Sequence, residues 1–278
     1  MKNNDEYICE PYSSILIGGY KLIDVQRSIF SILVEFDRIC KKHNIKYILD
    51  GGTLLGAIRH SGFIPWDDDA DVAMLRSEYN KFCKVCKKEL DSRFFLETKK
   101  VNKKYPYAFA KLRLNGTIYK ENFLNNLDVH NGIWIDIFPI DKTSKLTFRL
   151  QTKLSLIWRS IRWKKTKEIS CTSKHDRLFK FISLITPYWL INSCEDFSIR
   201  FLNIFPLKKV SKLCHPGPGK SVESIDYYKK LTTHKFWGND FFVPLNYDEW
   251  LRQRYKNPYV LPNEEKRMPA HSGGQVKL

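Results

Sequence analysis

The stretch from Tyr47 to Met74 restricts what this chain can fold into more than any other part of its sequence. A short apolar run ends at Asp50 and is followed by Gly51 and Gly52, which is the pattern of a buried strand that enters a tight turn. Glycine tolerates positive φ angles and lets a ligand approach the backbone closely. The pattern therefore predicts a ligand site at this turn.

The residues after the glycine pair predict a short helix whose N-terminus binds phosphate. Thr53 suits a helix N-cap, and residues 54–60 give about two helical turns before Gly62 stops the helix. The first turn of a helix offers free N–H groups and the positive end of the helix dipole. We therefore expect Gly51, Gly52 and Thr53 to hold a phosphate group.

Four aspartates between positions 67 and 71 predict a metal site. Asp69 and Asp71 are two residues apart in a predicted strand, so both side chains should project from one face. Two carboxylates on one face repel each other unless a cation lies between them. Oxygen ligands beside a phosphate suit Mg²⁺ or Mn²⁺. An acidic loop that caps a helix is the alternative interpretation.

A basic strand predicts the counter-charge for a phosphorylated substrate. In residues 107–113, Lys111 and Arg113 alternate with apolar residues and share a face. Two such cations can neutralise a pyrophosphate, arginine by a bidentate contact and lysine as a point charge. The alternative is a strand face that only contacts solvent.

A third carboxylate interrupts the apolar strand of residues 132–141, which reads GIWIDIFPID. Burial of Asp136 in such a strand is costly unless its charge meets a cation. The alternative, an aspartate that caps the next turn, suits Asp141 better. Asp136 is therefore a candidate for the same metal site as Asp69 and Asp71.

The segments GGTLLGAIRHSGFIPWDDDADVAM and IWIDIFPID resemble the LicD family, which is named for bacterial phosphorylcholine transfer and includes relatives of fukutin. The family belongs to the nucleotidyltransferase-fold superfamily. The resemblance implies an α/β (α+β) fold, in which helices flank a nucleotidyltransferase-like mixed sheet. It also implies that Asp69, Asp71 and Asp136 hold the metal and that Asp136 accepts a proton from the attacking hydroxyl.

Changes in composition divide the chain into four expected parts. They are an N-terminal lead-in (1–20), a nucleotidyltransferase-like catalytic core (21–145), a helical insertion rich in basic and aromatic residues (146–207) and a C-terminal segment that packs on the core (208–278). The core should begin with an amphipathic helix, because apolar residues recur there at steps of three and four. These residues are Leu22, Val25, Ile29, Ile32, Leu33, Phe36 and Ile39.

The charge of the chain predicts anionic partners. A net charge of +17 favours polyanions, phosphorylated glycans, nucleotides or an anionic lipid surface, although it also keeps a protein soluble. Aromatic residues among lysines and arginines in 146–207 suit an anionic membrane surface, and a helical cover over the sheet is the alternative. The polar first ten residues, the lack of a spanning apolar run and seven scattered cysteines predict a cytoplasmic protein, with a position at the inner membrane face as one option.

The resemblance implies a metal-dependent phosphotransferase. It would move phosphocholine or a similar phospho-group from a CDP-activated donor to a hydroxyl of a cell-surface glycan or its lipid-linked precursor, as in lipopolysaccharide, capsule or teichoic acid. Arg59 and His60 lie near the far end of the short helix, where His60 would orient the acceptor or serve the structure only. Trp66 would stack on a base or on choline through a cation–π contact, or simply pack in the core.

Two alternatives stay open. The same fold supports nucleotidyl transfer to RNA or to a small acceptor, which the positive charge permits. A non-catalytic polyanion-binding protein is the other, but polyanion binding does not require three converging acids. Nucleic acid is therefore not the expected partner.

Overall fold

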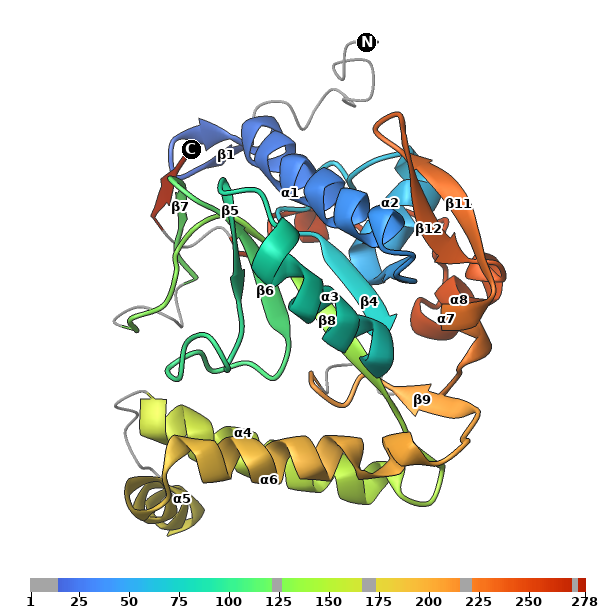
Figure 1. Cartoon of the computed structure of the whole chain (residues 1–278). Helices are drawn as coiled ribbons and strands as arrows, with labels where there is room; N and C mark the ends of the chain where they lie inside the picture. Colours follow the sequence, from blue (N-terminus) through green and yellow to red (C-terminus); the bar gives the residue numbers. More distant parts are fainter. Residues whose placement is uncertain (1–14, 122–126, 167–173, 216–221, 272–274) are drawn as a thin grey trace.

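The computed structural model describes residues 15–121, 127–166, 174–215, 222–271 and 275–278 of the chain. It has a mixed α/β fold in which helices flank a mixed sheet, as predicted (Figure 1). No helix in these ranges combines the length and the apolar character that a membrane crossing requires.

The central sheet is organised around β8 (Trp134–Lys142). On one edge β8 pairs in parallel with β4 (Asp71–Leu75), and β3 (Ile48–Leu49) lies outside β4. On the other edge the first half of β8 pairs antiparallel with β6 (Ala110–Leu114), which pairs with β5 (Phe94–Glu97). The last two residues of β8 pair with β9 (Lys209–Ser211), which continues to β10 (Glu223–Ser224).

One face of this sheet is covered by α1 (Leu22–Lys42) and α3 (Arg76–Glu89), which cross the strands in Figure 1. All seven apolar positions predicted for the first helix are buried, so the amphipathic pattern identified its packing face correctly. Beyond α1 the chain turns at Asn44, whose φ of 49° prevents the helix from continuing.

Three helices form a separate layer below the sheet in Figure 1: α4 (Phe148–Thr166), α5 (Lys174–Ile185) and α6 (Tyr188–Arg200). A 3₁₀ helix, η4 (Phe201–Ile204), follows α6. This layer is tied to the core by charge: Lys99 lies 3.0 Å from Glu195 and 2.5 Å from Asp196. Glu195 is fully buried and also pairs with Arg162 of α4.

The C-terminal part packs back onto the core. A hairpin of β11 (Leu231–Phe236) and β12 (Asn239–Pro244) follows α7 (Asp226–Lys229) and leads to α8 (Tyr247–Arg254). After η5 (Glu264–Lys266), the last strand, β13 (Val276–Lys277), pairs with β7 (Ile118–Tyr119). Near the N-terminus, β1 (Leu16–Ile17) and β2 (Tyr20–Lys21) form a small ribbon. The return to β7 brings residues around position 270 next to the acidic stretch.

Candidate active site

The glycine turn leaves room for carboxylates at the start of α2 (Gly51–His60). Gly51 has a φ of 55°, which favours glycine, and a Cβ atom on it would lie 3.1 Å from Oδ2 of Asp71. A Cβ atom on Gly52 would lie only 2.7 Å from Oδ2 of Asp67. The glycine pair thus allows two acidic side chains to approach the first turn of the helix, where the dipole favours negative charge.

The helix begins earlier than its sequence predicted. Asp50 is its N-cap residue, and the N–H of Leu54 donates to the carbonyl of Asp50 at 3.2 Å. The predicted N-cap at Thr53 is therefore wrong, because the extended backbone of Asp50 already ends β3. The Thr53 hydroxyl instead accepts a hydrogen bond from the N–H of Asp71 at 2.8 Å and ties the helix to β4.

Asp71 and Asp136 lie side by side at the starts of two parallel strands. They are register partners in the β4–β8 pair, and the N–H of Asp136 donates to the carbonyl of Ala70 at 2.9 Å. On the far side of β8, Lys111 of β6 is the register partner of Asp136, and its Nζ lies 2.8 Å from Oδ1 of that carboxylate. Asp71 of β4, Asp136 of β8 and Lys111 of β6 therefore lie in one row across three adjacent strands.

Asp69 does not share a strand with Asp71, because β4 begins at Asp71. The predicted alternation along one strand is wrong in this respect. Asp69 is nevertheless close enough to interact with both partners. After burial, the charge of Asp136 is among the causes that raise the pKa of Asp69, and the charge of Asp69 is among those that raise the pKa of Asp71. The structure thus brings the three predicted carboxylates to one region, one from a loop and two from strands.

A second group of potential metal ligands lies next to these residues. Asp68, Asp69 and His271 each offer a ligand atom, and the three atoms lie within 4.8 Å of one another. Asp68 accepts hydrogen bonds from the hydroxyl of Tyr119 at 2.5 Å and from the N–H of His271 at 2.9 Å. Within the described residues, Asp69, Asp71 and Asp136 do not form such a close group by themselves.

Burial and mutual repulsion make this acidic region hard to ionise fully. Burial, with the charges of neighbouring aspartates, raises the pKa of Asp67 and of Asp69 to about 7. The same causes raise the pKa of Asp71 well above its usual range. Burial also opposes the charge of Asp68, but hydrogen bonds from His271 and Tyr119 outweigh it and lower its pKa. Such a region attracts either protons or a cation.

The residues present fit a hard divalent cation. Carboxylate oxygens from Asp68, Asp69, Asp71 and Asp136 are the ligands that Mg²⁺ and Mn²⁺ prefer, and one imidazole is compatible with Mn²⁺. The region is a possible acidic metal-binding cluster whose charge a cation would balance. Burial alone would lower the pKa of His271, but its bond to Asp68 and the charge of Asp69 raise it to about 9.

A lysine that the sequence analysis missed lies behind Asp71. Lys212 contacts the buried carboxylate of Asp50, and its Nζ lies 3.8 Å from the ring centroid of Phe138. Burial favours the neutral amine, yet the charges of Asp50 and Asp71 raise the pKa of Lys212. Arg254 of α8 also approaches Asp50, at 3.7 Å. Lys212 stands within an otherwise uninformative stretch, so only the tertiary fold reveals its position.

The other predicted site residues contact protein groups. Arg59 donates to the carbonyl of Pro258 at 3.0 Å and to Nε2 of His60 at 2.8 Å. Burial and the charge of Arg59 lower the pKa of His60 to about 4, so its imidazole is neutral at physiological pH. Trp66 is buried, and the guanidinium of Arg267 lies 5.8 Å from its ring centroid.

Arg113 takes a different position from the one expected of a phosphate ligand. Its side chain is 1% exposed, and its Nε donates to Glu97 at 2.7 Å. It shares a face with Lys111 as predicted, but it offers almost no surface to a phosphate. Lys111 is also buried, although its contact with Asp136 places it at the acidic region.

Comparison with known proteins identifies clear relatives. Residues 44–168 match the family described as LicD/FKTN/FKRP, nucleotidyltransferase domain. The chain is 30% identical over 262 residues to the lipopolysaccharide cholinephosphotransferase LicD of Haemophilus influenzae, and the match covers 90% of this chain and 96% of that protein. A shorter match of 62 residues is 39% identical to the uncharacterized protein RP689 of Rickettsia prowazekii and covers 22% of each chain. Another, of 58 residues, is 38% identical to the uncharacterized protein RT0683 of Rickettsia typhi and covers 21% of this chain and 19% of that protein.

Proposed function

Because this chain belongs to the LicD family and is a LicD-type phosphotransferase, we propose that it transfers phosphocholine, or a similar phospho-group, from a CDP-activated donor to a hydroxyl of a cell-surface glycan or its precursor. The pairing of Asp71 with Asp136 across parallel strands, beside the glycine turn and Lys111, is the observation that carries this proposal. The Haemophilus relative, whose name states lipopolysaccharide cholinephosphotransfer, supports the choice of substrate class.

We propose Mg²⁺ or Mn²⁺ as the cofactor, held by Asp69, Asp71 and Asp136 with Asp68 and His271 close by. A divalent cation in this place supplies charge neutralisation for the pyrophosphate oxygens of the donor. Burial and the charges of neighbouring aspartates raise the pKa of each of Asp67, Asp69 and Asp71, and this supports a cation here, because positive charge offsets both the cost of burying a carboxylate and the mutual repulsion.

Different groups of the site would bind the donor and accept the proton of the acceptor. The first N–H groups of α2, from Gly51 to Thr53, would bind a phosphate, and Lys111 would add positive charge. The acceptor oxygen attacks the phosphorus that carries the choline, the bond from that phosphorus to the bridging oxygen breaks, and CMP leaves with the electron pair. Asp136 would accept the proton of the attacking hydroxyl. Its Oδ1 atom lies 2.8 Å from Nζ of Lys111, which orients the carboxylate within the site.

Two further residues, His60 and Trp66, belong to the proposal as substrate contacts. The neutral imidazole of His60, held by Arg59, would orient the acceptor. Trp66 would stack on the choline or the base through the 7% of its surface that is exposed. Arg113 would first have to leave Glu97 before it reached a phosphate, so we expect Lys111 to carry that contact.

We also propose that the acceptor meets the enzyme at the inner face of a membrane. Large apolar side chains are exposed along α5, α6 and η4, among them Leu184, Trp189, Phe197 and Ile204. Residues 145–209 hold fourteen lysines and arginines but only four acidic residues. Apolar side chains beside excess positive charge suit the surface of an anionic bilayer. Transfer to a lipid-linked glycan would benefit from this contact.

Donor specificity tests the function. Purified protein with Mg²⁺ and a glycan acceptor would be incubated separately with CDP-choline, CDP-ribitol, CDP-glycerol and CTP. We expect release of CMP from one CDP-linked donor, because its pyrophosphate bond is the one that breaks. Release of pyrophosphate from CTP alone would replace the proposal with nucleotidyl transfer, the alternative that the high positive charge leaves open.

A further inference from the structure

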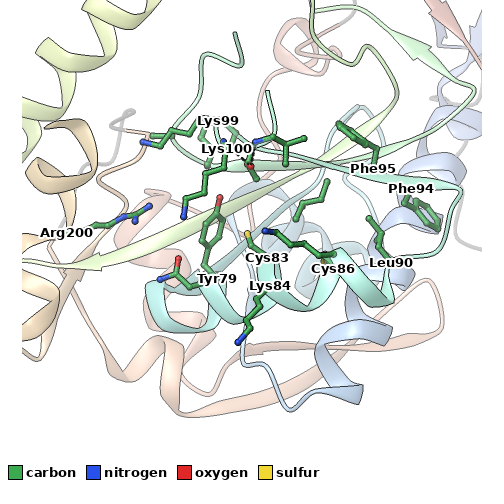
Figure 2. A pocket seen from close by; sticks show the side chains of 17 residues that line it. Tyr79, Cys83, Lys84, Cys86, Leu90, Phe94, Phe95, Lys99, Lys100 and Arg200 are labelled. Carbon is green, nitrogen blue, oxygen red and sulfur yellow. Dashed lines mark hydrogen bonds between the residues drawn. The ribbon is translucent and has the colours of Figure 1, made fainter. Parts of the chain in front are cut away.

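A second candidate site lies away from the acidic residues. A cavity of about 500 Å³ opens between α3, β5 and the loop after β5, and Arg200 of α6 reaches it from the helical layer. Figure 2 shows Tyr79 and Cys83 of α3 on one side, and Arg200 at the end opposite Phe94. Its volume is typical of small-molecule sites, which measure roughly 300–1,000 Å³. None of the aspartates of the candidate active site lines it.

The charges around this cavity favour an anion. Lys84, Lys87 and Lys100 line it and are exposed, and no ion pair of their ammonium groups occurs within the described residues. Lys99 and Arg200 also line it, although each contacts Asp196, at 2.5 and 3.3 Å. No aspartate or glutamate is among the lining residues, so a cation such as choline would find no counter-charge.

The inner wall of the cavity is apolar. Leu90, Phe94 and Leu96 contribute to it, together with the thiols of Cys83 and Cys86. Burial raises the pKa of Cys83 to about 11 even though the charges of Arg76 and Lys100 oppose this, so the thiol is neutral and behaves as a small apolar group. A free phosphate or sulfate would leave this wall uncovered, whereas a hydrocarbon chain would cover it.

We propose that this cavity binds an anionic amphiphile, namely a phosphate ester on a single hydrocarbon chain. The phosphate would lie beside Lys87 and Lys100, and the chain would lie against Phe94 and Leu96. Because Arg200 belongs to α6 and the other walls to the core, such a ligand would contact both layers of the protein. This proposal does not depend on the transfer reaction, since binding at the cavity is measured without a donor.

Calorimetric titration with decyl phosphate, kept below its critical micelle concentration, tests the proposal. We expect saturable binding at one site, and affinity that rises from butyl to decyl phosphate by roughly threefold or more for every two methylene groups. Inorganic phosphate and the neutral decyl glucoside should each bind at least tenfold more weakly than decyl phosphate, as expected when head and chain both contribute. Equal binding of either compound would overturn the proposal.

Charge-reversal variants locate the site. Lys87→Glu with Lys100→Glu should weaken decyl phosphate binding by about tenfold or more, because two attractive charges become repulsive. The control is Lys88→Glu with Lys103→Glu, which changes the net charge equally at two exposed lysines outside the lining. All four positions are exposed, so both proteins should fold. Equal loss in both proteins would show general attraction to the basic surface and would refute the site.

Discussion

Asp136 meets Asp71 on one side and Lys111 on the other, so its removal tests the proposed chemistry at the scale of one residue. Asp136→Asn keeps the shape but removes the base, and kcat should fall by about 10²–10⁴-fold while the protein stays folded. Steady-state measurement of CMP release, with circular dichroism as a check on folding, gives the answer. Asp128→Asn is the control, because that side chain is 86% exposed and pairs with Lys104 on the surface. Equal activity of both variants would remove Asp136 from the mechanism.

The raised pKa values of the aspartates predict how pH and metal ions change the thermal stability of the protein. The pKa of Asp67 and of Asp69 rises from 3.8 to about 7 on folding. A raised folded-state pKa stabilises the protein at low pH, and this stabilisation is lost as the pH rises through the folded pKa. The metal-free melting temperature should therefore fall as the pH rises from about 4 to about 7, and Mg²⁺ or Mn²⁺ should raise it more at the higher pH.

Thermal scans with and without a chelator would measure this effect. Asp67→Asn should flatten the pH profile, because it removes one of the repelling charges. A melting temperature that stays constant with pH and does not respond to either cation would contradict the assignment of a metal site.

Some residues of the site could be predicted from the sequence, and others could not. Asp136 was identified because a carboxylate in an apolar strand needs a partner, and Asp71 because of its two-residue spacing from Asp69. The strand register brings Asp71 and Asp136 together. His271 and Lys212 were missed as site residues, because their partners lie 203 and 162 positions away in the chain. No local pattern encodes contacts of that range.

At the scale of elements, the close approach of a carboxylate to the glycine turn predicts the effect of a substitution at Gly52. A methyl group on Gly52 would lie 2.7 Å from the Asp67 carboxylate. Gly52→Ala should therefore displace that carboxylate and lower activity at least tenfold, although alanine favours the helix by about 1 kcal/mol. Activity measured together with the melting temperature separates the two effects.

Gly238→Ala is the matched control for this variant. Its position in the β11–β12 turn has a φ of 83° but no atom within 4 Å of an added Cβ. It should lose stability and retain activity, because L-residues are strained at positive φ. Full activity in Gly52→Ala would show that the turn tolerates a side chain.

Strongly periodic or apolar elements were predicted well, and their ends were not. The stripe of α1 is buried as expected, and the apolar strand with Asp136 is β8. The starts of α2 and β4 were misplaced by a few residues, because Asp50 caps the helix and the aspartates before Asp71 form a loop. Tertiary contacts of the acidic side chains decide those boundaries, and propensity does not include them.

At the scale of the whole molecule, the helical layer predicts binding to membranes. The protein should sediment with phosphatidylglycerol vesicles and remain in solution with phosphatidylcholine vesicles, because its excess charge is positive. Trp189→Ser with Phe197→Ser, both exposed in α6, should weaken binding by about tenfold through lost apolar burial. Val260→Ser with Leu261→Ser removes exposed apolar groups elsewhere and should have no effect. Equal binding to both lipids would contradict the proposal.

The return of the C-terminal part to the acidic stretch has a consequence for synthesis on the ribosome. Asp68 leaves the ribosome long before His271, which is 203 positions later, and Asp50 precedes its counter-ion Lys212 by 162 positions. Until late in translation, the nascent acidic loop therefore lacks the imidazole of His271, and Asp50 lacks the ammonium group of Lys212. The acidic region can gain all of these contacts only after residue 271 has emerged, so we expect a product that stops before His271 to be inactive.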